Sequence, residues 1–456
     1  MEFSVNIIAT GTCVSAGRKK VGGQIKPNQT KRSRSMLKRI DWDWDPGSTE
    51  IAVISDWQKK FNWVEEPYVS PDGEKIAAIV NLAEGEFNVC VNGDTWETVF
   101  DKIWNLRFGP DGRLTAIVSE AGEWTVAVDG TPWDNKFEYV WNLMFSPDGN
   151  SIAVAVKQDM TYGMALNNTV WEKTFSNMTH PTLSPDGNRT AAAVQVADFG
   201  EGEIHKFQEG VFSVALDGKP WDTKFVNVWQ MAISADGQKV AAEVRLNLYD
   251  YTIAVNGIPW EQTFNCVWEP IFHPQKDAVI APVRTGGGWF LAQDGQIIWD
   301  RKFVQLWHAM FSPDGKKIAA VVAPKYGRWT IAVDGNPWPV SFGDLATDPS
   351  FSPDGSRIAA IAKEGDNWMV IVDGTVWKNK FDMAWQPVFN DSGETVAVKI
   401  ERNGKYSIAI NDRVWDQACD AVWDPVFSPE GDKILLRTLQ DGVYTRSVLS
   451  VEDIIR

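Results

Sequence analysis

The feature that most constrains this 456-residue chain is an internal repeat of about 39 residues. Each unit contains Ser-Pro-Asp-Gly or a degenerate copy of it, and neighbouring copies begin 37 to 40 residues apart except for one step of 50. A unit of this size buries its apolar faces only against its neighbours, so the fold must be an array or a ring of similar units. The copies begin at Ser70, Gly109, Ser146, Ser184, Ser234, His273, Ser312, Ser352, Asn390 and Ser428.

The residues of one unit predict four short antiparallel strands. The apolar run "WNLMF" (141–145) ends in a tight turn, for which Pro147 and Gly149 are suited, and "SIAVAV" (151–156) follows as the second strand. A third strand such as "WTVAVDG" ends in a second turn, and "TPWDNKF" (131–137) is interpreted as an outer strand. Four strands in about 40 residues is the size of a β-propeller blade.

The predicted fold is therefore an all-β propeller of about ten four-stranded blades. We favour a single closed ring; two smaller propellers of five blades each are the alternative. The last unit reaches the C-terminus without an outer Trp strand, whereas residues 52–61 have the spacing of an outer strand without a preceding Ser-Pro-Asp-Gly turn. We predict that 52–61 pairs with 443–450 and closes the ring, which removes a free sheet edge.

The chain contains 24 tryptophans, most of them in register with the repeat. In a first series each Trp precedes a Phe, or a Cys after the last Trp of the series, by four residues, and we interpret it as packing between blades. The series is Trp57, Trp96, Trp133, Trp171, Trp221, Trp260, Trp299, Trp338, Trp377 and Trp415. A further aromatic residue lies six positions before the Gly of the second turn in nearly every unit, as at Trp124.

A second Trp series lies four residues after that Phe or Cys, where the outer strand leads into the next innermost strand. We expect some of these rings near one mouth of the central channel, and because Trp is enriched among the residues that dominate interfaces, they are candidate partner contacts. The candidates are Trp104, Trp229, Trp268, Trp307, Trp385 and Trp423. Trp141 belongs to the same series and is expected to pack. Thr179 and Ala346 replace Trp in two units, and we predict that a partner segment enters there.

In each blade, the turn between strands one and two and the turn between strands three and four lie on one side. The variable loops must therefore share the opposite face. The longest variable loop, 196–210, causes the 50-residue step, and long loops on rigid scaffolds often carry function. We predict a partner interface there at Glu201, Glu203, His205 and Lys206.

Charge divides the chain into a basic N-terminal arm (1–40) and a propeller (41–456). The arm has nine Lys/Arg against one acid, so it carries about +8 and the propeller about −24 of the net −16. An acidic body disfavours nucleic acid as the main ligand. No apolar run is long enough to span a membrane, and the charges of the arm follow its apolar stretch, which is unlike a signal peptide. "MLKRIDWDWDPG" at Met36 is an alternative start.

The sequence predicts no cofactor, no metal site and no catalytic centre. Cys13, Cys90, Cys266 and Cys419 form no Cys-x-x-Cys pair, and the four histidines do not recur in register. The repeated turn aspartates lie one per turn, so they are expected to bond their own turns instead of a metal. Nucleophile-elbow, zincin, P-loop and dinucleotide motifs are missing.

The "FSPDG…IAA.V" element (145–154, 311–321, 351–360) resembles the PD40 repeat of TolB-like, WD40-like propellers. With "VDGxPWDxxFxxVW" in almost every unit, the chain resembles the tryptophan-rich cytoplasmic subunit of the Tmc transmembrane electron-transfer complex of sulfate-reducing bacteria. The resemblance implies that haems and iron–sulfur clusters belong to other subunits and that this one carries no cofactor. Residues 1–40 match nothing in that family.

Three functions follow as expectations. The favoured one is a non-catalytic scaffold or regulatory subunit, docked on the cytoplasmic side of a membrane-bound redox complex and peripheral to the membrane. Its partners would be the iron–sulfur and haem-carrying subunits, with no nucleic acid. The second is a free TolB-like propeller that binds a peptide, glycan or protein. The third is a hydrolase or lyase propeller, which would need an acid cluster or a nucleophile–base pair at the channel mouth.

Overall fold

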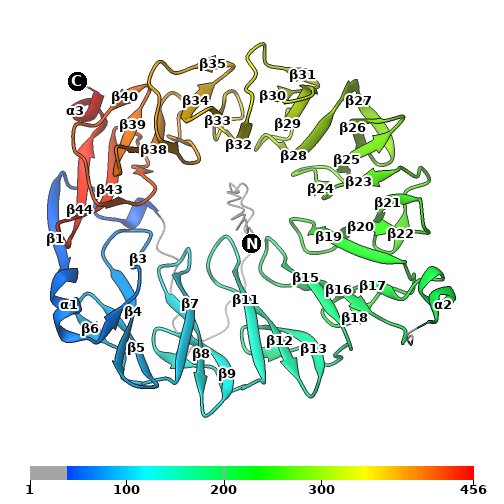
Figure 1. The fold of residues 1–456 in the computed structure, drawn as a ribbon, viewed down its shortest axis with the longest axis horizontal. Coiled ribbons are helices and arrows are strands. Elements are labelled where there is room, and N and C mark those ends of the chain that lie inside the picture. The colour runs from blue at the N-terminus through cyan, green and yellow to red at the C-terminus, as the bar shows by residue number, and fades with distance from the viewer. Residues whose placement is uncertain (1–38, 199, 201, 456) are drawn as a thin grey trace, which may run out of the picture.

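The structure is a computed structural model that describes residues 39–198, 200 and 202–455, and these form a ring of ten β-sheets around a central channel (Figure 1). Each sheet is one blade, numbered 1 to 10 from the unit of Ser70 to the unit of Ser428. The predicted single ring of ten blades is thus confirmed, and the alternative of two five-bladed propellers is wrong. In blades 1, 6, 9 and 10 the innermost strand is split into two short pieces.

The strands of blades 1 to 5 are, from the channel outward, β2 (Trp63–Val64), β3 (Tyr68–Val69), β4 (Ile76–Ala83), β5 (Glu86–Val91) and β6 (Asp94–Thr95); β7 (Lys102–Phe108), β8 (Leu114–Glu120), β9 (Glu123–Val128) and β10 (Thr131–Pro132); β11 (Tyr139–Phe145), β12 (Ile152–Gln158), β13 (Thr161–Leu166) and β14 (Thr169–Val170); β15 (Met178–Leu183), β16 (Thr190–Gln195), β17 (Phe212–Leu216) and β18 (Lys219–Pro220); β19 (Asn227–Ile233), β20 (Val240–Arg245), β21 (Tyr251–Val255) and β22 (Ile258–Pro259).

The strands of blades 6 to 10 are β23 (Cys266–Val267), β24 (Ile271–Phe272), β25 (Val279–Thr285), β26 (Gly288–Gln293) and β27 (Gln296–Phe303); β28 (Gln305–Phe311), β29 (Ile318–Lys325), β30 (Arg328–Val333) and β31 (Asn336–Pro337); β32 (Leu345–Phe351), β33 (Ile358–Glu364), β34 (Asn367–Val372) and β35 (Thr375–Val376); β36 (Met383–Ala384), β37 (Val388–Phe389), β38 (Val396–Arg402), β39 (Lys405–Ile410) and β40 (Arg413–Val414); β41 (Ala421–Val422), β42 (Val426–Phe427), β43 (Lys433–Gln440), β44 (Val443–Ser450) and β1 (Gly47–Val53).

The Ser-Pro-Asp-Gly turn is held by its own side chains. In blade 3, the Ser146 hydroxyl donates to the Asp148 carboxylate and accepts a bond from the Ser151 N–H. The same carboxylate accepts the N–H of Asn150, and Gly149 has the positive φ (71°) that the turn needs. The Asp of the Ser-Pro-Asp-Gly turn therefore bonds its own turn, as the sequence predicted. For the Asp of the second turn the prediction is wrong, because its carboxylate bonds the backbone just after the first turn, as Asp129 bonds the N–H of Leu114.

The two kinds of uniform turn share one face of the ring. In blade 2, the carboxylate of Asp129, in the second turn, accepts a 2.9 Å hydrogen bond from the N–H of Leu114, the first residue after the Gly109 turn. The same bond recurs between Asp217 and Thr190 in blade 4. We call this side the turn face. The loops between the second and third strands and the connections between blades lie on the opposite side, the variable-loop face.

The ring is closed by β1, which pairs antiparallel with β44, with Ala52 opposite Tyr444 and Val53 opposite Val443. Closure is thus confirmed, but the prediction of one strand over 52–61 is wrong beyond Val53. Residues Ile54–Lys60 form helix α1 instead, and Trp57 and Phe61, four residues apart, are buried in one cluster. The described chain has two further short α-helices, α2 (Ile204–Gln208) and α3 (Val451–Ile455), and a 3-10 helix, η1 (Arg39–Asp41).

The outer strand is shorter than the sequence predicted. In blade 2 only Thr131 and Pro132 form β10, and the chain rejoins the sheet at a single bridge between Phe137 and Trp124. Between these points the side chain of Asn135 bonds Asn168 of the next blade, which draws the backbone away from the sheet. Blade 6 is the exception, since β27 continues for eight residues.

The first Trp series packs between blades, as predicted. Trp57, Trp171 and Trp299 are at most 8% exposed, and the Trp171 Nε1–H donates a 2.8 Å hydrogen bond to the Thr190 hydroxyl of the next blade. Trp171 also meets the ring of Phe175 edge-on. Between blades 9 and 10, helix α3, which follows β44, packs in the cluster that contains Trp415. The core is therefore divided into interblade clusters, each sealed at its outer edge by one Trp.

Candidate functional site

The second Trp series lies on the innermost strands, where each ring contacts the aromatic residue of the third strand in its own blade. Centroid separations run from 4.6 Å to 6.0 Å. The pairs are Trp104–Trp124, Trp141–Tyr162, Trp229–Tyr251, Trp268–Trp289, Trp307–Trp329, Trp385–Tyr406 and Trp423–Tyr444. These rings therefore form intrablade pairs beside the channel, and all seven of the inner-strand rings remain partly exposed.

Local backbone geometry places these rings. In blade 3 the pairing of β11 with β12 is interrupted between Trp141 and Met144, and Asn142 has a positive φ of 57°. Such a bulge inserts residues on one strand without partners opposite them. Equivalent irregularities occur at Trp104 and Trp307. The bulge holds the Trp near the middle of the innermost strand.

Blades 2 and 3 join two of these pairs into one continuous aromatic strip. Tyr139 contacts Trp104 at 5.5 Å and Trp141 at 5.9 Å, and it also touches Trp124. Trp104 and Tyr139 are 38% and 39% exposed, so the strip presents ring surface to solvent. Trp141 is partly buried against an interblade cluster, so its main contacts are packing contacts, as expected.

The ring of inner-strand tryptophans has three gaps, of which the sequence indicated one correctly. Thr179 pairs with Ala193 as Trp141 pairs with Ala155. The second gap is Thr347 and not Ala346, because one extra residue after Phe342 shifts the register. Glu65 of blade 1 is a third gap that the sequence reading missed: its N–H bonds the second strand as those of Trp268 and Trp385 do.

The predicted loop residues lie far from the tryptophans. Helix α2 is at the outer rim of the ring, whereas the innermost strands border the channel (Figure 1). Lys206 forms an ion pair with Glu203, whose carboxylate also accepts the Gly200 N–H, and His205 is exposed. Glu201 lies outside the described residues. The structure therefore does not bring the two predicted groups together.

Several variable loops have large apolar side chains that are exposed to solvent. Tyr326 is 92% exposed on the loop between β29 and β30, and Tyr249 is 77% exposed on the loop between β20 and β21. The others are Met160, Ile204 and Leu248, at 73%, 64% and 45% exposure. Isolated exposed apolar residues are ordinary, but blades 3, 4, 5 and 7 all place them on the same face. The variable-loop face therefore presents exposed apolar side chains at the ends of loops from four blades.

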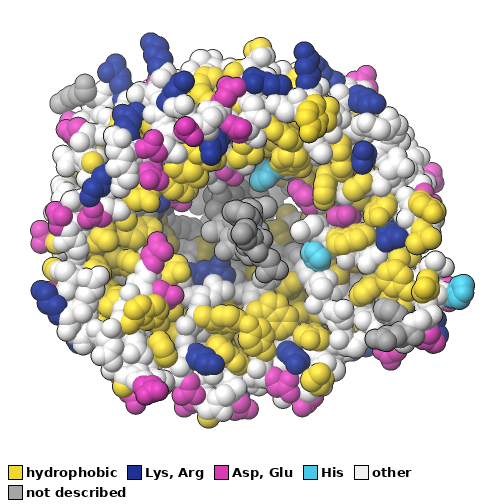
Figure 2. Space-filling model, in the orientation of Figure 1, with side chains coloured by type: hydrophobic (Ala, Val, Ile, Leu, Met, Phe, Trp, Pro, Cys, Tyr) yellow, Lys and Arg dark blue, Asp and Glu magenta, His cyan; other side chains and the backbone are white. Residues whose placement is uncertain are grey.

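The residue after each inner-strand Trp position is polar in all ten blades, a pattern that the sequence reading did not use. The set is Glu66, Asn105, Asn142, His180, Gln230, Glu269, His308, Asp348, Gln386 and Asp424. It contains four acids and no Lys or Arg. Around the opening of the channel, acidic and histidine side chains lie among hydrophobic and other side chains (Figure 2). We call this set the polar annulus.

Burial perturbs the ionisable groups of blades 5 to 8. Burial and the neighbouring Glu269 carboxylate raise the pKa of Glu243 to about 8. Burial also raises the pKa values of Glu269 and Asp348. The His308 imidazole acts on both carboxyl groups in the opposite direction and lowers their pKa values. These four groups therefore influence one another across four successive blades.

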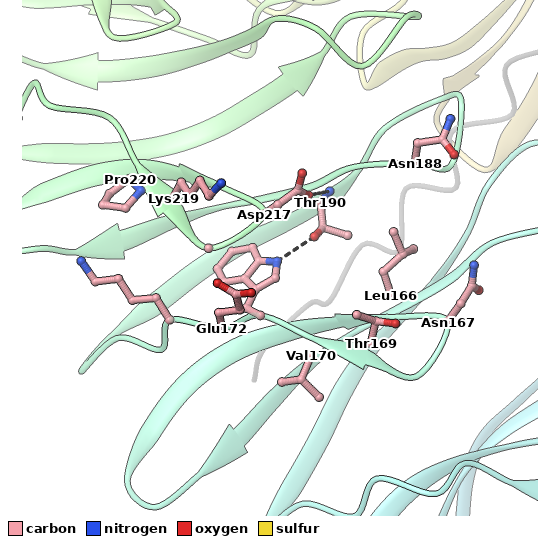
Figure 3. A pocket seen from close by; sticks show the side chains of 13 residues that line it. Leu166, Asn167, Thr169, Val170, Glu172, Asn188, Thr190, Asp217, Lys219 and Pro220 are labelled. Carbon is pink, nitrogen blue, oxygen red and sulfur yellow. Dashed lines mark hydrogen bonds between the residues drawn. The ribbon is translucent and has the colours of Figure 1, made fainter.

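A cleft of about 630 Å³ lies between blades 3 and 4 on the turn face. Trp171 is one of the residues that line it, and Asp217 and Thr190 lie on one side of the cleft with Glu172 on the other (Figure 3). The cleft is a groove between the second turn of blade 3 and the second turn of blade 4, and Trp171 does not fill it. The described residues contain no group of three His, Cys, Asp or Glu side chains that would hold a metal ion.

The described cysteines are thiols, and Cys90 and Cys419 are buried. Burial raises the pKa of Cys90 to about 11, which keeps its reactive thiolate form scarce at neutral pH. Cys13 lies outside the described residues. Within the described chain, none of the helices is long and apolar enough to cross a bilayer.

The solved structures to which this chain is similar are distant from it in sequence and in structure. No protein-family model matches the chain, and no curated protein matches it. A crystal structure described as the eukaryotic initiation factor is 14% identical, covers 82% of this chain and 88% of its own, and gives a TM-score of 0.42. The Dos1 propeller is 12% identical, covers 73% and 93%, and gives a TM-score of 0.36. The chain is a β-propeller by its own ten sheets, whatever these distant neighbours bind.

Proposed function

We propose that this propeller is a non-catalytic scaffold that binds a protein partner on its variable-loop face. The supporting observation is that this face combines the projecting apolar loop tips with the half-exposed aromatic strip of blades 2 and 3. Trp and Tyr are the residue types most enriched among those that dominate protein interfaces.

The finer proposal is a subunit docked on the cytoplasmic side of a membrane-bound electron-transfer complex, peripheral to the membrane. Its partners would be the iron–sulfur and haem-carrying subunits. The Trp spacing along the whole propeller supports this proposal through the resemblance to the Tmc subunit. A free TolB-like propeller that binds a peptide, glycan or protein is the second candidate, and the long loop at 196–210 favours it.

The test is capture of partners from detergent-solubilised membranes by the tagged full-length chain. Trp104→Ala with Tyr139→Ala removes the strip, and Lys316→Ala, an exposed residue on the turn face, is the matched control. The proposal predicts that the double variant loses captured proteins that wild type and the control retain, while its Tm stays well above the temperature of the capture. Redox subunits among the lost proteins support the finer assignment. Equal capture by all three chains contradicts the scaffold face.

A further inference from the structure

The channel wall of blades 5 to 8 contains a buried acid without a cationic partner. Glu243 is 7% exposed on β20, opposite the bulge that carries Trp229. Within the described residues its carboxylate has no hydrogen bond or ion pair, and its charged neighbour is Glu269 on the next blade. A buried carboxylate is costly unless a cation or a hydrogen-bond donor compensates it.

The neighbouring blades continue this acidic wall. His308 of blade 7 acts on Glu269 and also on Asp348 of blade 8. All three residues belong to the polar annulus, which supplies no Lys or Arg. Three carboxylates and one imidazole therefore line one side of the channel, in a propeller that carries about −24 charges outside its arm.

On the opposite wall of the channel, basic side chains of the protein itself interact with the acidic residues. Lys399 and Arg437 occupy, in blades 9 and 10, the second-strand position that Glu243 holds in blade 5. The Lys399 ammonium lies 4.4 Å from the ring centre of Trp385 and 5.2 Å from that of Tyr406, and it interacts with Asp424 and Glu66. On that side the protein itself places a cation between an aromatic pair and the acids of the annulus.

Blades 6 and 7 contain the same aromatic pair without the cation. The rings of Trp268 and Trp289 stack with an interplanar angle of 8°, and Trp268, which precedes Glu269, is 38% exposed. Trp307 and Trp329 lie 4.6 Å apart in the next blade. Acids beside exposed Trp faces suit a guanidinium, which combines ion pairing with stacking on an aromatic ring.

We propose that the channel wall of blades 5 to 8 binds an arginine-bearing segment of the partner protein, through Glu243, Glu269 and Asp348 and the face of Trp268. This inference rests on the proposed scaffold function and names the chemistry of the bound segment. Electrostatic complementarity of this kind selects partners and speeds association more than it adds raw affinity.

The test is a titration of the full-length chain with fluorescent hexa-arginine, followed by anisotropy at physiological salt. The proposal predicts saturable binding that Glu269→Gln and Asp348→Asn weaken about tenfold or more. Glu86→Gln makes the same change of charge on the exposed β4–β5 hairpin and should alter the affinity less than twofold. Hexa-glutamate should not bind. Equal effects of the three substitutions would show general acidity and overturn the site.

A second arm of the test separates the partner from the chain's own basic arm. Arg32→Gln with Arg34→Gln in the full-length chain should leave the affinity unchanged if the site awaits a partner segment. A large gain in affinity would show that the arm occupies the wall and would overturn the proposal. Because this titration needs no captured partner, its failure leaves the membrane-capture result for the variable-loop face standing.

Discussion

The indole of Trp96 in one blade lies against Gly130 in the second turn of the next, so closely that a Cβ built on Gly130 would be 2.9 Å from the Trp96 Cγ. The same relationship joins Trp171 to Gly218 and Trp299 to Gly335. It explains why the Trp and the Asp-Gly turn recur together in the sequence. Each blade offers a flat ring, and its neighbour leaves out the one side chain that would prevent the contact.

We expect Gly130→Ala to destabilise the protein more than Gly122→Ala. Both glycines have a φ near 82°, so both substitutions impose the same backbone strain, but a Cβ at Gly122 meets nothing within 4 Å. The difference in free energy of unfolding, measured with denaturant, should be about 1–3 kcal/mol. Equal losses of stability would mean that the contact with Trp96 does not exclude a side chain at position 130.

Because the ring is closed through Tyr444, we expect Tyr444→Phe to lower the stability of the protein. The buried Tyr444 hydroxyl donates a 2.9 Å hydrogen bond to the carbonyl of Gly73, and so links the last blade to the first. Removing it leaves a buried carbonyl without that donor, so we expect a loss of about 1–2 kcal/mol in the free energy of unfolding. Tyr326→Phe, 92% exposed, is the control and should change nothing. An unchanged stability of Tyr444→Phe would argue against this link.

The buried carboxyl group of Glu243 should make the stability of the folded protein depend on pH. Its pKa is about 8 in the folded protein against 4.5 ordinarily, so between these values the folded state holds a proton that the unfolded state has released. Stability should therefore fall as pH rises through this window and level off above pH 8. Glu243→Gln should match wild type near pH 5 and have a higher Tm near pH 9. Parallel Tm curves across this range would contradict a buried neutral Glu243.

The two Trp series should respond differently to truncation. Trp171→Ala leaves a cavity between blades and an unpaired Thr190 hydroxyl, so we expect a loss of about 3–5 kcal/mol. Trp268→Ala removes a ring that is 38% exposed and should cost well under half of that. Thermal unfolding of the two variants measures the contrast. Equal losses would show that both series serve packing alone.

Much of the fold could be predicted because the repeat encodes it locally. The turn chemistry of Ser146 and Gly149 and the alternation of apolar strands define a blade, and counting units gives ten. Closure followed from the unpaired outer element near Trp57. What failed was local detail: residues 54–60 form a helix, with Trp57 and Phe61 in one buried cluster, and in blade 2 the outer strand is short because Asn135 bonds the next blade.

The candidate site was harder to predict because its residues come from different blades. The candidate tryptophans were found by their period, yet Tyr139, which joins two pairs into a strip, has no aromatic counterpart in the neighbouring units of Trp104 and Thr179. The acidic wall has no motif at all, since Glu243 and Asp348 are separated by more than 100 residues. A signal existed in the polar residue after each Trp position, but only ring closure shows that these residues face one channel.

The central claim is that a protein partner covers the variable-loop face. Hydroxyl-radical footprinting of the captured complex, compared with the free chain, measures this directly for individual Trp and Tyr side chains. The account predicts that Trp104, Tyr139 and Tyr326 become protected while Tyr68, near the Ser70 turn on the opposite face, keeps its reactivity. Protection of Tyr68 with unchanged oxidation of Trp104 and Tyr139 would place the partner on the turn face and contradict the account.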